Sequence, residues 1–468
     1  MRYITYNTRR LRIVMNLFFV VLLILIFSTP VLCQDHPKES KEKKVLNLQQ
    51  CIEKAVEVSP EIGEVRYEED IYKSKKIQAD SSAYPQIELI AVTGPSPEAR
   101  GDQVYSPDSV TSPTVNGIFG SADVLLIQPI YSFGKLRNLQ EAASSGIKAA
   151  QAATDKKTSD IILRIKELYY SLLLARDMKN LVLEIRDELT DTIDKLEKQL
   201  EQGSPWAEEV QLYKLKAFLG EVEKKLNETE KGIALAQEAL KAHLDLPQET
   251  DFDIEDTSLT PEDRSPVNLD SSIYKALESR PEFIQLKEGL NAKNHLVEAE
   301  KSNYYPTFFV GLGATIAGAT NRTRITNPFI YDVFSRTYGA AFLGLKWSID
   351  FGITKGKVQE AEAEYHMLLE KKRFADSAIP LEVKKVFFEL REATKSIPET
   401  ETGYKNAKKW LVAAVANFDL GLGEAKEIAD AAVVYAQLKA DYLRSLYNQR
   451  IASANLSYAT GVDLKEIQ

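Results

Sequence analysis

The ten residues Ile52–Glu61, which read IEKAVEVSPE, recur 221 positions later as Ile273–Glu282, which read IYKALESRPE. Six of the ten positions carry the same residue. Tyr84-Pro85 likewise matches Tyr305-Pro306 at the same offset. A constant offset along a chain indicates an internal repeat. The sequence therefore predicts a tandem duplication.

The repeat extends to the end of the chain. Tyr131-Ser132-Phe133-Gly134 matches Ile349-Asp350-Phe351-Gly352, and Asp245-Leu246 matches Asp463-Leu464, both at an offset of 218. We assign the first unit to residues 46–246 and the second to residues 267–464. Between them, residues 247–266 are rich in Asp, Glu, Thr, Ser and Pro, a composition that predicts a loop-like linker.

Each unit contains a helix of unusual length. No proline occurs from Lys135 to Gln202, and apolar residues recur there at spacings of three or four. A continuous helix of this length would extend roughly 100 Å, and its pattern is typical of coiled-coil packing. The turn Gly203-Ser204-Pro205 ends it, and a second helix is predicted from 207 to 246. In the second unit Gly421-Leu422-Gly423 occupies the equivalent place before a helix over 424–461.

Two predicted strands precede each long helix. The four segments are rich in Ile, Leu, Val, Phe, Gly and Ala: 87–93, 117–131, 307–319 and 338–350. The loops 94–116 and 320–336 that connect them are longer than is usual in a compact soluble domain, but they suit strands that cross a bilayer. A buried sandwich core of two hairpins is the alternative that alternation alone leaves open. Each unit thus reads helix, two strands, very long helix, turn, helix.

The N-terminus resembles an export signal. Arg9, Arg10 and Arg12 precede an apolar run over 13–27, and Ser28-Thr29-Pro30 follows. This order predicts a secretory signal peptide over residues 1–33, cleaved after Cys33. An uncleaved anchor and a lipidated Cys33 are alternatives, although Leu32 stands where lipoproteins carry Gly or Ala.

Composition excludes several functional classes. The 468 residues carry a formal charge of −9, which argues against nucleic-acid binding. The four histidines and two cysteines have no ligand spacing, so no metal site or disulfide framework is predicted. We find no candidate nucleophile, phosphate-binding loop or catalytic carboxylate pair, and therefore expect neither a cofactor nor an enzyme.

A signal peptide, a duplicated helix-hairpin-helix unit and long coiled coils together resemble the TolC-type outer-membrane efflux family. Beyond the repeated motifs, Phe418-Asp419-Leu420-Gly421 carries the resemblance, which covers essentially the whole mature chain. It implies a mainly α protein with transmembrane strands. Three chains would give four strands each to one twelve-stranded β-barrel, continued by a long periplasmic α-helical barrel. The implied location is the outer membrane of a diderm bacterium, with a large periplasmic portion.

The resemblance also assigns site residues and partners. Glu427 and Asp430 fall on the positions of two carboxylates that line the closed entrance in the family. The tips, at Gly203, Ser204, Gly421, Leu422 and Gly423, would dock a periplasmic adaptor that connects the duct to an inner-membrane pump for efflux or type I secretion. The simpler reading of the two acids is that they stabilise the first turn of a helix. A periplasmic coiled-coil adaptor or scaffold without channel activity is the alternative function.

Overall fold

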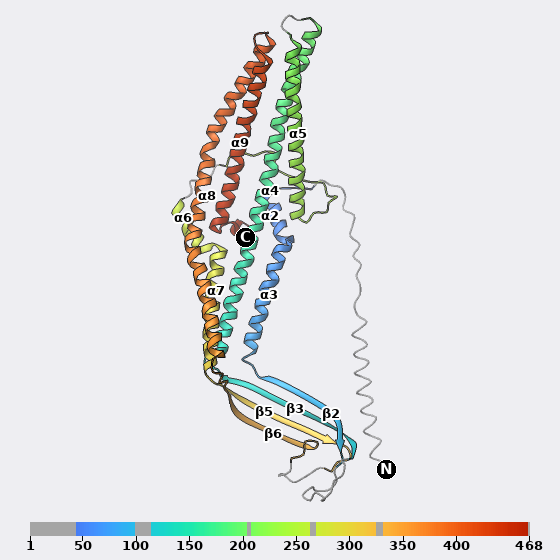
Figure 1. Cartoon of the computed structure of the whole chain (residues 1–468), viewed down its shortest axis with the longest axis vertical. Coiled ribbons are helices and arrows are strands. Elements are labelled where there is room, and N and C mark those ends of the chain that lie inside the picture. Colours follow the sequence, from blue (N-terminus) through green and yellow to red (C-terminus); the bar gives the residue numbers. More distant parts are fainter. Residues whose placement is uncertain (1–43, 99–113, 204–206, 263–267, 324–330, 467–468) are drawn as a thin grey trace. The chain divides into compact units, whose positions relative to one another are not determined.

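The computed structural model describes residues 44–98, 114–203, 207–262, 268–323 and 331–466, which Figure 1 draws as ribbons. The predicted signal peptide, and Ser204 among the predicted tip residues, lie outside this part of the chain. The described residues are mostly helical and contain two hairpins of long strands, so the prediction of a mainly α protein with two strand hairpins is confirmed. None of the described helices has both the length and the apolar character needed to cross a membrane.

Both halves of the chain contain the same elements in the same order. The first half consists of α2 (Leu48–Val58), α3 (Pro60–Ser81), β2 (Gln86–Pro97), β3 (Val115–Tyr131), α4 (Lys135–Glu201) and α5 (Glu209–His243). The second consists of α6 (Leu269–Ser279), α7 (Pro281–Lys301), β5 (Thr307–Ala319), β6 (Arg336–Lys346), α8 (Ile353–Asp419) and α9 (Ala425–Thr460). The long helices α4 and α8 have 67 residues each, and α2 and α6 have 11 each. This correspondence supports the proposed duplication.

The repeated motif is where one helix ends and the next begins. Ser59 and Arg280 have extended backbones, with ψ of 118° and 124°, and each is followed by a proline at the first position of α3 or α7. Proline disfavours the helical conformation of the residue before it but is well tolerated at the first position of a helix. The conserved role of Pro60 and Pro281 within the two repeats is therefore to separate two helices.

The four long strands form one antiparallel sheet in the order β2-β3-β5-β6. In its register Val124 of β3 lies between Leu89 of β2 and Ala314 of β5. The strands β3 and β6 lead to the long helices through Phe133-Gly134 and Phe351-Gly352, all four of which have positive φ. The same strained turn thus serves both repeats.

The linker contains structure that its composition does not indicate. Phe252–Ile254 form the short strand β4, which pairs in parallel with β1 (Lys44–Leu46). Phe252, Ile254 and Leu259 are buried against α2 and α4. Packing against neighbouring helices stabilises this strand. Its three residues are too few to show the alternation from which a strand is predicted.

The helices follow the order of the strands. In the part nearest the sheet, contacts connect α3 to α4, α4 to α7 and α7 to α8. Further along, α5 contacts α4, α4 contacts α9, and α9 contacts α8, which Figure 1 shows as two long hairpins. The described chain also contains two 3-10 turns, η1 (Ser302–Tyr304) before β5 and η2 (Asp463–Glu466) after α9.

Candidate functional site

One face of the four-stranded sheet carries no charged side chain and is mostly apolar. Because side chains alternate along a strand and paired residues share a face, the register places the following on one side. They are Ile87, Leu89 and Ala91 of β2, Ala122, Val124 and Leu126 of β3, Val310, Leu312, Ala314 and Ile316 of β5, and Ala341, Leu343 and Leu345 of β6. Leu89 is 67% exposed, Ile316 65% and Leu343 80%. A large exposed apolar surface of this kind requires a partner or a lipid environment.

The opposite face carries every charged residue of the four strands: Glu88, Asp123, Arg336 and Lys346. The Thr315 hydroxyl donates to Asp123 Oδ1 at 2.5 Å, and Arg336 lies 3.7 Å from the same carboxylate oxygen. Strands that are apolar on one face and polar on the other are typical of transmembrane sheets around a water-filled lumen. The sandwich core with both hairpins buried is not what the structure shows.

Aromatic side chains gather where the strands meet the helices. The Phe133 ring stacks on that of Tyr305 with centroids 4.8 Å apart, and Tyr131 packs edge-on against Phe133 at 4.8 Å. Further exposed aromatic residues at the same ends of the strands are Tyr84, Tyr304, Trp347 and Phe351. Aromatic residues concentrate in this way at the interface between membrane and water.

The second tip is a tight glycine turn. The Leu422 N–H donates to the Asn417 carbonyl at 2.9 Å and the Gly421 N–H to that of Phe418 at 2.9 Å, while Gly421 has a φ of 74°. This pair of bonds is a Schellman motif, which favours glycine at the left-handed position. A Cβ atom at Gly423 would lie 3.1 Å from the Phe418 nitrogen, so a side chain there would also be crowded.

Glu427 and Asp430 share the solvent-facing side of the first turns of α9. Both are exposed, whereas Ile428 between them is fully buried. No ion pair within the described residues involves either carboxylate. The structure therefore keeps both acids available on one helix face, as the spacing predicts.

The two tips contact one another. Gly203 ends the first long helix with a φ of 68°, and its N–H donates to the Leu200 carbonyl at 3.0 Å. The Lys195 ammonium lies 2.9 Å from Asp419, and the Ala425 N–H donates to the Gln211 side chain at 3.1 Å. These contacts join α4 to α8 and α5 to α9, so the predicted tip residues belong to one end of one four-helix assembly.

Two features escaped the sequence analysis. Asp123 and Arg336 were not singled out, although their place in the strand alternation could have revealed them. Four large apolar residues of α8, spaced seven residues apart, are also more than half exposed: Met367, Phe374, Leu381 and Phe388. A search for a second apolar row on the long helices would have found this stripe.

Comparisons with known proteins agree with this geometry. Residues 272–462 match the family model described as outer membrane efflux protein. No curated protein sequence matches the chain significantly. Among solved structures, the outer membrane protein VceC from Vibrio cholerae superposes with a TM-score of 0.74 at 19% identity, covering 88% of this chain and 96% of that one.

Two further solved structures have the same fold. The CmeC outer membrane channel of Campylobacter jejuni gives a TM-score of 0.72 at 14% identity and covers 91% of this chain and 90% of its own. The MtrE outer membrane channel of Neisseria gonorrhoeae, in its open state, gives 0.70 at 15% identity, with 94% and 97% covered. These likenesses show that the chain has the fold of these three outer membrane proteins.

The second half of the chain carries the sequence pattern of one such family, and the described chain as a whole has its fold. The resemblance stated from the sequence is confirmed.

Proposed function

We propose that three copies of this chain form an outer-membrane exit duct for efflux or type I secretion. The observation that carries the proposal is the sheet, with its exposed apolar face and all its charges on the other side. In this assembly the apolar face contacts outer-membrane lipid and the charged face lines the passage. Twelve strands close the barrel, and the long helices continue the duct into the periplasm.

The open sheet edges support an assembly of several copies. Within the described chain β2 and β6 each have one neighbour only, so their outer backbone groups lack strand partners. Lipid cannot satisfy backbone hydrogen bonds, and closure must come from another chain. Pairing β6 of one copy with β2 of the next completes the ring.

The two outermost helices next to the sheet also each have one side without a helix neighbour. Contacts run α3–α4–α7–α8, which leaves α3 and α8 on the two outer sides, next to β2 and β6 respectively. The α8 stripe defined above faces outward, and α3 exposes Tyr67 and Ile71. The apolar surface on both helices favours contact between α8 and α3 of adjacent copies.

The alternative function, a periplasmic adaptor or scaffold without channel activity, is not favoured. An adaptor whose hairpins form a small soluble β domain would bury their apolar residues. Here the apolar face of the sheet is exposed, and the matching family model describes an efflux protein.

We further propose that Glu427 and Asp430 form an acidic constriction at the periplasmic entrance. Threefold symmetry would bring two carboxylates from each chain around one axis, and rings of acidic side chains attract cations. The proposal rests on their shared exposed face and on their position directly after the Gly421–Gly423 turn.

Neutralising both acids, by Glu427→Gln with Asp430→Asn, should leave the trimer intact and reduce the selectivity for cations. In planar-bilayer conductance measurements, the concentration of a trivalent cation that blocks half the current should rise at least about tenfold, equivalent to ~1.4 kcal/mol of lost attraction. Glu424→Gln, which alters the exposed acid just before α9, is the matched control. If the double variant keeps the same cation selectivity and the same block by the trivalent cation, the two acids only stabilise the N-terminus of α9.

The tips are the proposed docking site for a periplasmic adaptor, which would connect the duct to an inner-membrane pump. Leu420 and Leu422 are 72% and 80% exposed at the second tip, so most of each apolar side chain faces solvent in the single chain. Grooves between helix ends receive partner helices through such apolar anchors.

A cysteine at Leu422 should crosslink to the adaptor in intact cells, whereas one at the exposed linker residue Glu249 should not. Cys51 need not be removed, because it is fully buried and burial raises the pKa of its thiol to about 12. Immunoblots of crosslinked envelopes provide the measurement. If the adaptor is captured at residue 249 and not at 422, docking at the tips is wrong.

A further inference from the structure

The last turn of the described chain buries a carboxyl group. Asp463 begins η2 and is 2% exposed, and neither of its carboxylate oxygens is accessible or accepts a hydrogen bond of ordinary geometry within the described residues. The hydroxyl of Ser159 on α4 is buried and lacks a hydrogen-bond partner in the same way. Because it is costly to bury an ionised carboxylate without such bonds, a carboxyl group in these surroundings holds its proton more tightly than one in water.

The equivalent aspartate of the first repeat has the opposite environment. Asp245-Leu246 corresponds to Asp463-Leu464 at the constant offset, but Asp245 is exposed and has a φ of 48°. In contrast, η2 contacts both α4 and α9, and Leu464 packs against the core cluster that includes Ile162 of α4. The buried carboxyl group therefore lies where the end of the second repeat rests on the long helix of the first.

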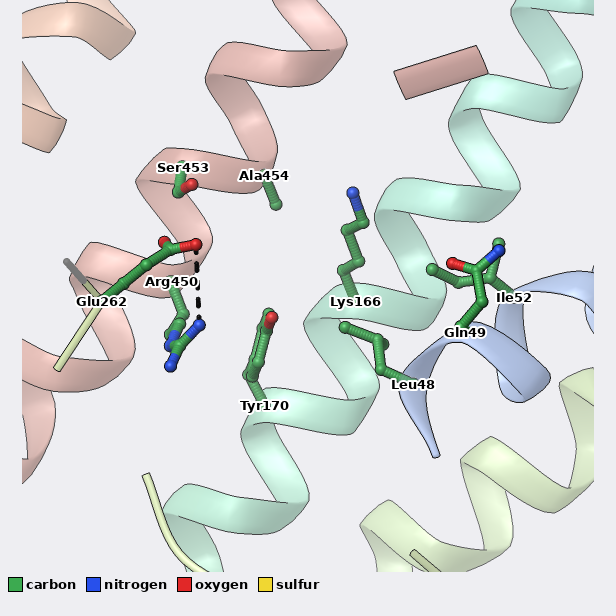
Figure 2. A pocket seen from close by; sticks show the side chains of 9 residues that line it. All are labelled: Leu48, Gln49, Ile52, Lys166, Tyr170, Glu262, Arg450, Ser453 and Ala454. Atoms are coloured by element: carbon green, nitrogen blue, oxygen red, sulfur yellow. Dashed lines mark ion pairs between the residues drawn. The ribbon is translucent and has the colours of Figure 1, made fainter. Parts of the chain in front are cut away.

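Lys166 of α4 is a charged group that acts on this carboxyl. It is 8% exposed and interacts electrostatically with Asp463. Lys166 also lines a cavity of about 270 Å³ between α4 and α9, and Figure 2 shows Arg450 of α9 on the other side of it. Arg450 lies 3.7 Å from Glu262 of the linker, so these two charges offset each other. The positive charge that bears on Asp463 is therefore that of Lys166.

The other titratable groups beside the end of α9 are engaged with one another. The Tyr458 hydroxyl of α9 donates to Asp160 of α4 at 2.8 Å, and burial raises the pKa of Tyr458, so it stays neutral in mild acid and mild base. Ion pairs no longer than 3.1 Å take up the remaining charges: Lys156 with Asp160, and Arg280 with Glu282 and Glu382. Among these groups, Asp463 is the one whose protonation we expect to change between mild acid and mild base.

We propose that Asp463 acts as a pH-sensitive clasp, which holds the end of α9 against α4 while its carboxyl group carries a proton and loosens when that group ionises. The protonated carboxyl can donate to the Ser159 hydroxyl, which satisfies both buried groups. Burial raises the pKa of Asp463, although Ser159, Lys166 and the backbone N–H groups of the turn oppose the shift. Since the docked turn binds the proton more tightly than the open one, the clasp is firmest in mild acid and weakens as the pH rises through the raised pKa.

Hydrogen exchange of the full-length protein, purified in detergent, at about pH 5.5 and about pH 8.5 tests the proposal. The rates of peptides covering residues 456–466 are divided by the intrinsic rates at each pH, because exchange itself accelerates with pH. The protection of these peptides should fall at least about tenfold between the two conditions. Asp463→Asn, which is neutral at both pH values, should keep the high protection throughout. Asp245→Asn is the matched control: it alters the exposed aspartate at the equivalent position and should retain the full pH dependence.

Several outcomes contradict the clasp. Protection that does not change with pH in the unaltered protein would mean that Asp463 does not control the turn. An equal fall in Asp463→Asn would assign the pH dependence to another group. If Asp463→Asn is less protected than the unaltered protein at the higher pH, an ionised carboxylate holds the turn. Should Asp463→Asn fail to fold, Asp463→Ala replaces it: its protection can be lower overall but should be the same at both pH values, and an undiminished pH dependence contradicts the proposal. None of these results depends on channel activity.

Discussion

Val124→Arg should prevent stable assembly of the protein in the outer membrane. Val124 lies near the middle of β3 on the apolar face, between Leu89 and Ala314. An arginine facing lipid at the midplane of a bilayer costs about 2–4 kcal/mol per chain, and a trimer would carry three. We expect the heat-modifiable trimer band to disappear from outer-membrane fractions, with the chain recovered as aggregated or degraded monomer.

The neighbouring residue provides a stringent control. Leu125 follows Val124 in the chain but lies on the charged face, where it pairs with Glu88. Leu125→Arg therefore places the same charge on the side proposed to face water, and it should leave the trimer in the membrane. If both variants assemble equally well, or only Leu125→Arg fails, the assignment of the two faces is wrong.

Ile428→Ala should loosen the tip end of the long helices. Ile428 is fully buried in a cluster that includes Leu189 of α4, Leu215 of α5 and Leu411 of α8. Truncation of a buried isoleucine to alanine costs about 2–5 kcal/mol, because it removes apolar contacts and leaves a cavity. Local opening at the tip should increase by about thirtyfold or more.

Hydrogen exchange with peptide resolution measures this opening. Peptides from the tip ends of α8 and α9 should exchange faster in Ile428→Ala, while peptides from α3 and the sheet should not change. Leu422→Ala removes an exposed side chain at the same tip and should alter stability by less than about 0.5 kcal/mol. Equal acceleration in both variants would show that the packing of Ile428 does not hold the tip together.

Local signals in the sequence predicted most of the elements, although the single helix expected before each hairpin is two helices, α2 with α3 and α6 with α7. The strand predicted over 307–319 is β5 with the same bounds, and the long helix predicted over 135–202 ends one residue earlier in α4. Apolar periodicity persists over many residues in these segments, and glycine or proline stops it sharply at Pro60, Pro281 and Gly421. The strand β4 was missed because three residues are too few to display a period.

The candidate sites also differ in whether local sequence or long-range contacts define them. The positions of Gly421 and of the Glu427 and Asp430 pair follow from spacing along one helix, which is a local property. The contact of Asp123 with Thr315 joins residues 192 positions apart and depends on the register of two strands from different repeats. The cavity between Lys166 and Arg450 likewise needs α2, α4, α9 and the linker to be brought together.

By itself the sequence determined the duplication of elements, the lengths of the long helices, the family resemblance and the residues of the tips. Each of these follows from a pattern of neighbouring residues or from repetition along the chain. Only the tertiary structure decided which face of the sheet is free of charge and which strands and helices form the two edges of the chain. It also decided which polar groups meet at the junction of the repeats. Those properties depend on pairing between distant segments. Side-chain alternation tells which residues share a face of one strand, but only register tells which faces of four strands coincide.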